Sequence, residues 1–334
     1  MSPSLLITIL IVVALIFDFL NGFHDSANIV STIISSRAMR PRSALLLSAA
    51  AEFCGPFLFG VAVATTLGHE VLVGRAVTMS VILSALGSAI VWNIVTWLLG
   101  IPSSSSHALI GGLVGAAVLG FGFEAIVIGG LLKVLVALLL SPLFGLLAGY
   151  LFMKLVLFAA RGASPRINRL FKRAQALTSL ALALSHGSND AQQTMGIITM
   201  GLVATGYLPT FAVPWWVVLA CAGAISLGTM LGGWRIIRTL GGKFYKIRPV
   251  HGFSTQVASA AVILGAALLG GPVSTTQVIS SAIMGVGAAE RISKVRWQVA
   301  GEIVIAWVFT IPATALMSAI LYWLIPGLGY IYYR

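Results

Sequence analysis

The sequence predicts an all-α polytopic membrane protein with about ten membrane passes and about twelve helical segments. Of its 334 residues, 59% are hydrophobic and only 8% are charged, whereas a soluble domain has roughly 25% charged residues. Apolar runs of the length that crosses a hydrocarbon core, roughly 20 helical residues, recur from one end of the chain to the other. Polar motifs also recur in both halves, which predicts two inverted-topology repeats with broken or re-entrant helices.

The first motif lies inside apolar runs. Residues 21–28, Asn-Gly-Phe-His-Asp-Ser-Ala-Asn, reappear in outline as residues 186–193, His-Gly-Ser-Asn-Asp-Ala-Gln-Gln. Asp25 thereby aligns with Asp190, and Asn28 with Gln193. Polar and charged residues are costly in hydrocarbon and need a partner or a bound ion there, so both copies are predicted to be functional. Asp18, which precedes the first copy, is expected to face solvent and receives no role.

A second motif follows each copy of the first. Residues 102–107, Pro-Ser-Ser-Ser-Ser-His, correspond to 272–277, Pro-Val-Ser-Thr-Thr-Gln, and Thr-Leu-Gly at 66–68 recurs at 239–241. Three landmarks in the same order indicate an internal repeat. The chain is therefore divided into a first repeat (1–125), a connector helix with a basic loop (126–173), a second repeat (174–296) and a C-terminal helix and tail (297–334).

The distribution of charge predicts how the repeats are oriented. The net charge is +12, but most of the 20 basic residues lie in four short segments, 37–42, 161–173, 235–248 and 291–296. Such segments are typical of cytoplasmic loops rather than of nucleic-acid binding. Loops that correspond between the halves carry opposite charge bias, so the repeats are predicted to be inverted. The N-terminus is then outside in a multi-pass protein of the cell (inner) membrane, and 4–36 and 174–204 each form one broken span.

The two aspartates are the predicted cation site. Asp25 and Asp190 offer hard carboxylate oxygens for a small cation, and Asn21 and Asn189 add amide oxygens that can complete its shell. We therefore assign sodium ions, or protons, to Asp25 and Asp190 as coupling ions, and expect no cofactor. In the alternative interpretation both aspartates only cap helix N-termini, although capping does not require a position inside the membrane.

The hydroxyl-rich motifs predict an oxyanion site. The hydroxyls come from Ser103, Ser104, Ser105 and Ser106 in the first half and from Ser274, Thr275 and Thr276 in the second. Both sets follow a proline at what should be a helix start, where backbone donors favour anions, so two inverted copies could converge on one tetrahedral oxyanion. The alternative is ordinary helix-start chemistry and packing. His107, Gln277 and Glu52 are predicted to lie next to the site, Glu52 as a neutral acid, an additional ion ligand or a proton carrier.

These motifs resemble those of the PiT family of inorganic phosphate transporters almost residue for residue. The resemblance rests on residues 21–28, Trp92-Asn93, 102–107 and 186–190, and it spans nearly the whole chain. It implies inverted repeats and a central phosphate held by the serine and threonine helix starts together with Asn28 and Gln193. It also implies cations near the two aspartates. Members of the family use sodium or protons, and some carry metal phosphate.

The predicted function is secondary active transport of inorganic phosphate by cation symport, with sodium as the coupling ion. The alternatives are a proton-coupled phosphate or metal-phosphate symporter, and a sulfate permease of the same fold. The paired aspartates argue against a passive anion channel. An enzyme is not expected, because Ser106 and His107 are neighbours whose side chains diverge on a helix and no Gly-x-Ser-x-Gly segment occurs. The predicted partners are phosphate, sodium and the lipid bilayer, but not nucleic acid; a homodimer stays open because no residue points to it.

Overall fold

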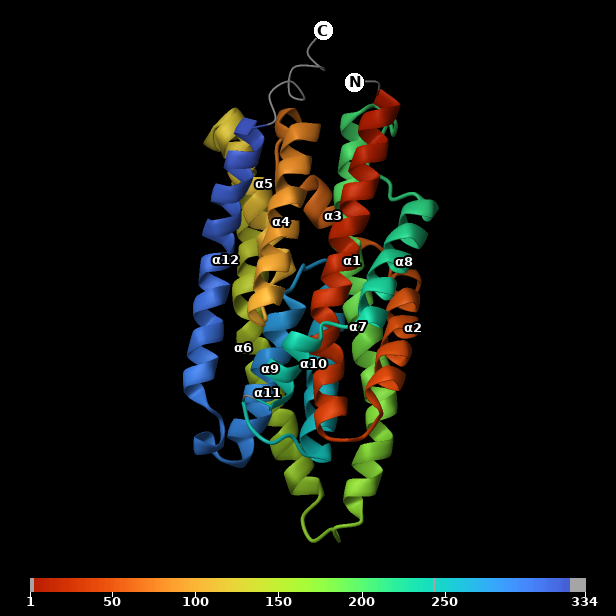
Figure 1. Cartoon of the computed structure of the whole chain (residues 1–334), viewed down its shortest axis with the longest axis vertical. Helices are drawn as coiled ribbons and strands as arrows, with labels where there is room; N and C mark the ends of the chain where they lie inside the picture. The colour runs from red at the N-terminus through yellow and green to blue at the C-terminus, as the bar shows by residue number, and fades with distance from the viewer. Residues whose placement is uncertain (1–2, 243, 325–334) are drawn as a thin grey trace.

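The computed structural model describes residues 3–242 and 244–324, and within them the chain is helical (Figure 1). The described residues form twelve α-helices and three short 3₁₀ turns, with one isolated β-bridge between Leu72 and Ile126. The predicted all-α class and the predicted number of helical segments are therefore confirmed. The predicted tail within 297–334 falls partly outside the described residues, as does Lys243 of the basic segment 235–248.

The helices form two successive groups joined by one long helix. The first group contains α1 (Pro3–Ser35), α2 (Pro41–Phe59), α3 (Ala62–His69), α4 (Met79–Leu99) and α5 (Ser105–Phe121). The joining helix is α6 (Ile128–Ala159). The second group contains α7 (Ile167–Ala204), α8 (Trp215–Leu231), α9 (Trp234–Gly242), α10 (Pro249–Leu268) and α11 (Thr275–Glu290), and α12 (Trp297–Leu324) follows it.

Several of the helices are suited to crossing a membrane. Among the described residues, six helices are long and apolar enough, namely α1, α2, α4, α6, α10 and α12, and the bent pair α8–α9 raises the number to seven. Helices α5 and α11 have only 17 and 16 residues, short of the roughly 20 that a crossing needs, so the number of passes stays a prediction. Each packs back against the helix before it. Figure 1 shows α4 and α5 in the upper half of the bundle and α10 and α11 in the lower half.

The predicted breaks in 4–36 and 174–204 are wrong, because α1 and α7 continue through both copies of the first motif. The chain breaks instead between α2 and α3, and between α8 and α9, where the bend is 69°. Glycine in the motif serves close helix packing. A Cβ on Gly22 would lie 2.1 Å from the carbonyl oxygen of Ile225 on α8, and one on Gly187 would lie 2.4 Å from that of Glu52 on α2.

The two groups of helices pack in matching ways. Helix α1 packs against α8 as α7 packs against α2, and α5 packs against α12 as α11 packs against α6. Each hairpin also turns at a glycine with positive φ, which L side chains rarely adopt. Gly100 after α4 has φ 68°, and Gly270 after α10 has φ 70°. This packing is what inverted repeats require, and the repeat itself stays a prediction.

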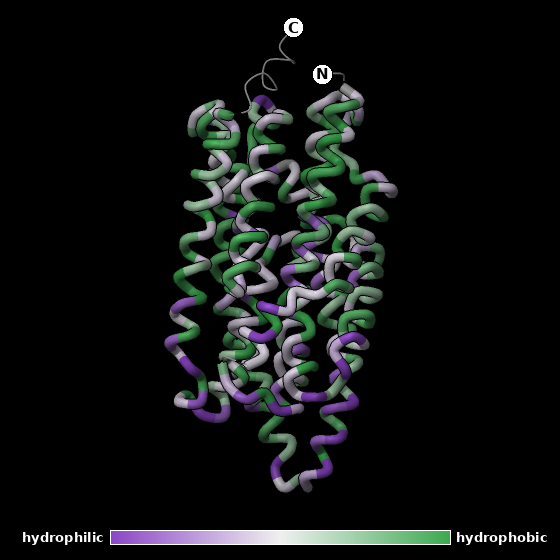
Figure 2. Tube along the Cα trace, in the orientation of Figure 1, coloured by the Kyte–Doolittle hydropathy of each residue, from purple (hydrophilic) through white to green (hydrophobic). Residues whose placement is uncertain are grey.

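The basic segments lie at one end of the bundle. The connections α1–α2, α6–α7, α9–α10 and α11–α12 are all at the lower end of Figure 1, opposite the start of α1. Figure 2 shows hydrophilic residues concentrated there, whereas long stretches of the outer helices are hydrophobic. Leu151 on α6 and Leu316 on α12, for example, are 63% and 65% exposed. A bundle with an apolar outer surface and charged connections is suited to a bilayer.

Candidate substrate and cation site

Two helix starts meet in the middle of the bundle. Ser104 caps α5, where its Oγ accepts a hydrogen bond from the backbone N–H of His107 at 3.2 Å. Ser274 caps α11 in the same way, accepting from the N–H of Gln277 at 3.3 Å. The side chains of the two predicted supporting residues touch, with Gln277 Nε2 3.4 Å from His107 Nε2. The serine and threonine motifs therefore come together, as the sequence predicted for two converging helix starts.

Asn28 and Gln193, which end the two copies of the first motif, make equivalent contacts. Asn28 Nδ2 on α1 donates to Thr276 Oγ1 at 2.8 Å, and Gln193 Nε2 on α7 donates to Ser106 Oγ at 2.8 Å. Ser106 donates in turn to the carbonyl oxygen of Val273 at 3.4 Å. Asn28 Oδ1 is buried and accepts no hydrogen bond. In each half, one side-chain amide thus donates a hydrogen bond to a hydroxyl in the hairpin of the other half.

Thr275 connects the two aspartates. Its Oγ1 lies 3.0 Å from Asp190 Oδ2 and 3.4 Å from Asp25 Oδ2. Thr276 Oγ1 donates to Asp25 Oδ1 at 3.0 Å. All four side chains are buried. The two carboxylates predicted to hold cations therefore lie close to the α11 hydroxyls and to each other, although one comes from α1 and the other from α7.

His186 belongs to this cluster, and the sequence analysis did not assign it. Its Nε2 lies 3.4 Å from Asp190 Oδ2 and 3.7 Å from Asp25 Oδ2, and its Nδ1 lies 2.6 Å from Glu52 Oε1. Ligand atoms of Asp25, His186 and Asp190 all lie within 4.8 Å of one another, which is an arrangement that can hold a metal ion. The internal repeat could have indicated this residue, because His186 aligns with the predicted ligand Asn21. Glu52, predicted to lie beside the site, does so through His186.

Asn21 and Asn189 bond the hairpins, and in the described part of the chain neither forms a hydrogen bond to the aspartates. Asn21 Oδ1 accepts from Ser105 Oγ at 2.7 Å, and Asn189 Nδ2 donates to the carbonyl oxygen of Gly271 at 3.3 Å. Asn21 Nδ2, Asn189 Oδ1 and Asp190 Oδ1 are buried without a hydrogen-bond partner. Unsatisfied buried polar atoms are uncommon and require an explanation, and several of them around one cluster point to a polar ligand.

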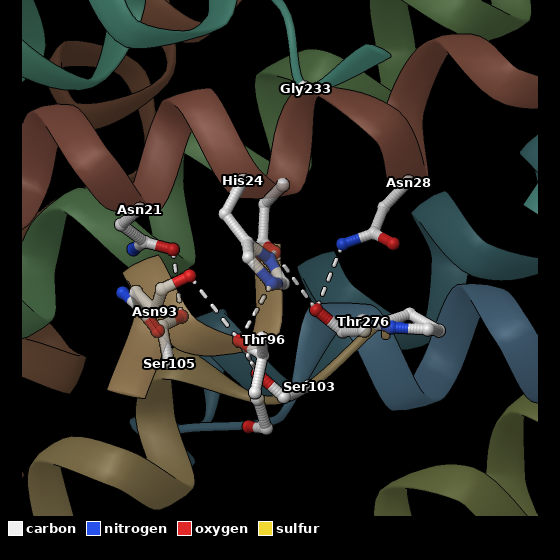
Figure 3. A network of polar contacts seen from close by, with 12 residues as sticks. Asn21, His24, Asn28, Asn93, Thr96, Ser103, Ser105, Gly233 and Thr276 are labelled. Carbon is white, nitrogen blue, oxygen red and sulfur yellow. Dashed lines mark hydrogen bonds and ion pairs between the residues drawn. The ribbon is translucent and has the colours of Figure 1, made fainter. Parts of the chain in front are cut away.

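A chain of polar contacts joins Asp25 to the α4–α5 hairpin (Figure 3). His24 Nδ1 lies 2.8 Å from Asp25 Oδ1, and His24 Nε2 lies 3.4 Å from Thr96 Oγ1. Ser103 Oγ, a predicted phosphate ligand, donates to Thr96 Oγ1 at 2.8 Å. No motif marks Thr96, which lies inside the apolar helix α4, so only the three-dimensional structure reveals this connection.

Comparison with known proteins identifies close relatives. The model of a family described as "Phosphate transporter family" matches residues 21–164 and 158–318. A probable low-affinity inorganic phosphate transporter of Rhizobium meliloti is 50% identical over 315 residues, which cover 94% of each chain. A protein of the same description from Bacillus subtilis is 46% identical over 331 residues, 97% of this chain and 99% of its own. A solved structure described as "The sodium-dependent phosphate transporter" has a TM-score of 0.86 and 26% identity, covering 96% of this chain and 98% of its own.

Proposed function

Because the chain belongs to the phosphate transporter family, we propose that it moves inorganic phosphate across the membrane by cation symport, with sodium as the coupling ion. The family and these relatives are phosphate transporters and not enzymes, as the sequence predicted. The sodium dependence of the similar solved structure supports sodium as the ion. The arrangement of the buried carboxylates supports the symport itself.

One observation carries the proposal, namely that buried carboxylates from both halves share the hydroxyl of Thr275. Two carboxylates in a low-dielectric interior repel each other and repel a phosphate anion strongly. Cations bound by Asp25 and Asp190 remove that repulsion, so phosphate can bind only after them. Such ordered binding is thermodynamic coupling between the two solutes.

The ligands divide into two sets. We assign phosphate to the amides and hydroxyls at the two helix starts, that is Asn28, Ser103, Ser104, Ser105, Ser106, Gln193, Ser274, Thr275 and Thr276. We assign the cations to Asn21, Asp25, Asn189 and Asp190. The contacts between Asn28 and Thr276 and between Gln193 and Ser106, both 2.8 Å, are then exchanged for hydrogen bonds to phosphate oxygens. The capping hydroxyls of Ser104 and Ser274 contribute through the backbone donors that they orient.

Alternating access follows if the segments 1–125 and 174–296 are inverted repeats. One hairpin, α4–α5, lies in the upper half of the bundle and the other, α10–α11, in the lower half (Figure 1). Rocking of one helix group against the other can expose the central site to either side in turn. Helix α6, in the connector 126–173, packs against α11, and α12, in the segment 297–334, packs against α5. These contacts hold the two helix groups together.

The proposed orientation places the N-terminus outside and the basic end in the cytoplasm. In a variant without native cysteines, Ser164→Cys in the α6–α7 connection should not react with a membrane-impermeant maleimide in whole cells. Thr210→Cys in the α7–α8 connection should react. Both residues are exposed, so the two sites are matched for access. The opposite labelling pattern would show that the orientation is wrong.

Proton coupling is the alternative that one observation favours. His186 lies within ion-pair distance of Asp25, Glu52 and Asp190, so the cluster already contains an imidazole, which is a group that can carry a proton. Sulfate is less suitable than phosphate, because it is fully ionised and has no proton to donate to a carboxylate or carbonyl.

Uptake of labelled phosphate into proteoliposomes tests the proposal. We expect an inward sodium gradient to drive uptake, and excess sulfate not to compete. Uptake driven only by a proton gradient would reassign the coupling ion, whereas equal uptake with metal phosphate would reassign the substrate. Flux that follows the phosphate gradient alone, with no cation requirement, would contradict symport.

Ser105 and Thr275 occupy corresponding positions but have different partners, which predicts different effects. Ser105 Oγ donates to Asn21 at 2.7 Å, whereas Thr275 bonds the two aspartates. Thr275→Val should therefore raise the sodium concentration for half-maximal uptake by roughly tenfold, since hydrogen bonds to charged groups contribute about 1.5–3 kcal/mol. Ser105→Ala should chiefly raise the KM for phosphate. Equal shifts of both parameters in both variants would show that the contacts of Thr275 with the aspartates do not influence cation binding.

A further inference from the structure

Asp18 is a buried acid that the proposed site does not use. It lies on α1 about two helical turns before Asp25. The sequence suggested that it faces solvent, but its side chain is fully buried. The expectation is therefore wrong, because the face of α1 that carries Asp18 packs against α7 and α8.

The Asp18 carboxyl has one hydrogen bond and one free oxygen. Thr194 Oγ1 on α7 donates to Asp18 Oδ1 at 2.9 Å, and Oδ2 is buried without a partner. The Cys221 thiol of α8 lies beside it. The other ionisable groups that face it are Glu52 of α2 and His186 and Asp190 of α7, and these act on it only through space. Among the residues that the structure describes, no basic side chain forms an ion pair with Asp18.

An ionised carboxylate in this position is strongly unfavourable, because it is buried without a counter-ion. A metal cation is an unsuitable counter-ion here, since hard cations require several oxygen ligands. One turn away from Asp18, Thr194 and Cys221, on the side that points away from the aspartate pair, are Ala14, Ile198 and Val218, which belong to a buried apolar cluster. A proton needs only one oxygen, and Oδ2 is free to carry it.

We propose that Asp18 is a proton-binding site separate from the aspartate pair, and that it gives up its proton when α1 and α7 separate during transport. The Thr194 bond joins the two helices that carry Asp25 and Asp190, so opening the central site breaks this contact and admits water. The O–H bond of Oδ2 then breaks, the proton passes to water, and the carboxylate keeps the electron pair. The bound proton stands on the structure alone, whereas its release rests on the proposed function.

Infrared spectroscopy of the purified protein tests the bound proton without any transport assay. The wild-type spectrum minus that of Asp18→Asn at neutral pH should contain the carbonyl stretch of one protonated carboxylic acid. Thr194→Val should keep that band at a higher frequency, because Oδ1 loses its hydrogen-bond donor. Asparagine resembles the protonated carboxyl in shape and charge, so the variant should fold. A difference spectrum with carboxylate bands instead would overturn the proposal.

The pH dependence of uptake tests proton release. At a fixed sodium gradient, the wild-type rate should change by up to about tenfold per pH unit on the acidic side of the Asp18 titration, as an ionised fraction does. The Asp18→Asn rate should lack this component. The ratio of the two rates removes the titration of phosphate, which is common to both. An infrared band with an unchanged ratio would make Asp18 a structural neutral acid, and absence of uptake in both proteins would contradict the proposed function but not the bound proton.

Discussion

Replacement of Asp25 or Asp190 by Asn should abolish sodium-driven phosphate uptake while the protein remains folded and inserted. Each change removes a charged oxygen pair from the centre of the cation cluster, and charge-assisted interactions are about twice as strong as neutral ones. We expect uptake to fall at least about 100-fold, which corresponds to about 2.7 kcal/mol. The measurement is the initial rate in proteoliposomes as a function of sodium concentration.

The matched control for these variants is Glu124→Gln. Glu124 pairs with Arg75 at 3.0 Å, but its side chain is 85% exposed, and exposed ion pairs contribute little. This variant should transport as the wild type does.

A second readout separates the cation from the substrate, because a ligand that binds only the folded state raises its stability. Sodium should therefore raise the unfolding temperature of the wild type in detergent but not that of either aspartate variant. Unchanged sodium dependence in both variants would exclude these residues as cation ligands.

The sequence was sufficient to mark the candidate site, because its polar residues are energetically costly inside apolar segments. Apolar runs of membrane length left few positions for polar side chains, so Asp25, Asp190 and the serine and threonine clusters stood out. The repeat then paired them, and the structure brings them together. His186 is also a polar residue in an apolar segment, but the sequence analysis gave it no role. It aligns with Asn21 in the repeat, yet the two side chains differ in chemistry.

The rest of the site depends on tertiary packing that no local pattern encodes. The contact of Thr275 with both aspartates requires the start of α11 to lie beside Asp25 of α1 and Asp190 of α7. Thr96 lies inside an apolar helix and joins the polar network only because α4 folds beside α1. From the sequence Asp18 was expected to be exposed, and only the packing of α7 and α8 against α1 buries it. In each case the sequence specifies the residue, and the neighbouring helix specifies its role.

The prediction of broken helices failed for a related physical reason. The sequence predicted one broken span in each of 4–36 and 174–204, and glycine inside a helix, as at Gly22 and Gly187, lowers its stability. The same missing side chain allows two backbones to approach closely, and this use is the one that the structure shows. Gly22 lies against Ile225 and Gly187 against Glu52, so both motif helices are continuous where they meet their neighbours.

Replacement of Gly187 by Ala should consequently destabilise the folded protein and damage the site. The added Cβ would lie 2.4 Å from the carbonyl oxygen of Glu52 and 2.8 Å from its Cα. These are backbone atoms, so α7 and α2 must move apart. Overpacking of this kind costs about 1–3 kcal/mol. Displacement of Glu52 also disturbs its 2.6 Å contact with His186, so uptake should fall together with the unfolding temperature in detergent.

The control is Gly223→Ala on α8, where an added Cβ would meet nothing within 4 Å. Alanine is a better helix former than glycine by about 0.8–1.0 kcal/mol, so this variant should be at least as stable as the wild type. Gly22→Ala should behave like Gly187→Ala, because its Cβ would lie 2.1 Å from the carbonyl oxygen of Ile225. If both motif variants unfold at the wild-type temperature, the close approach of the helices does not explain these glycines.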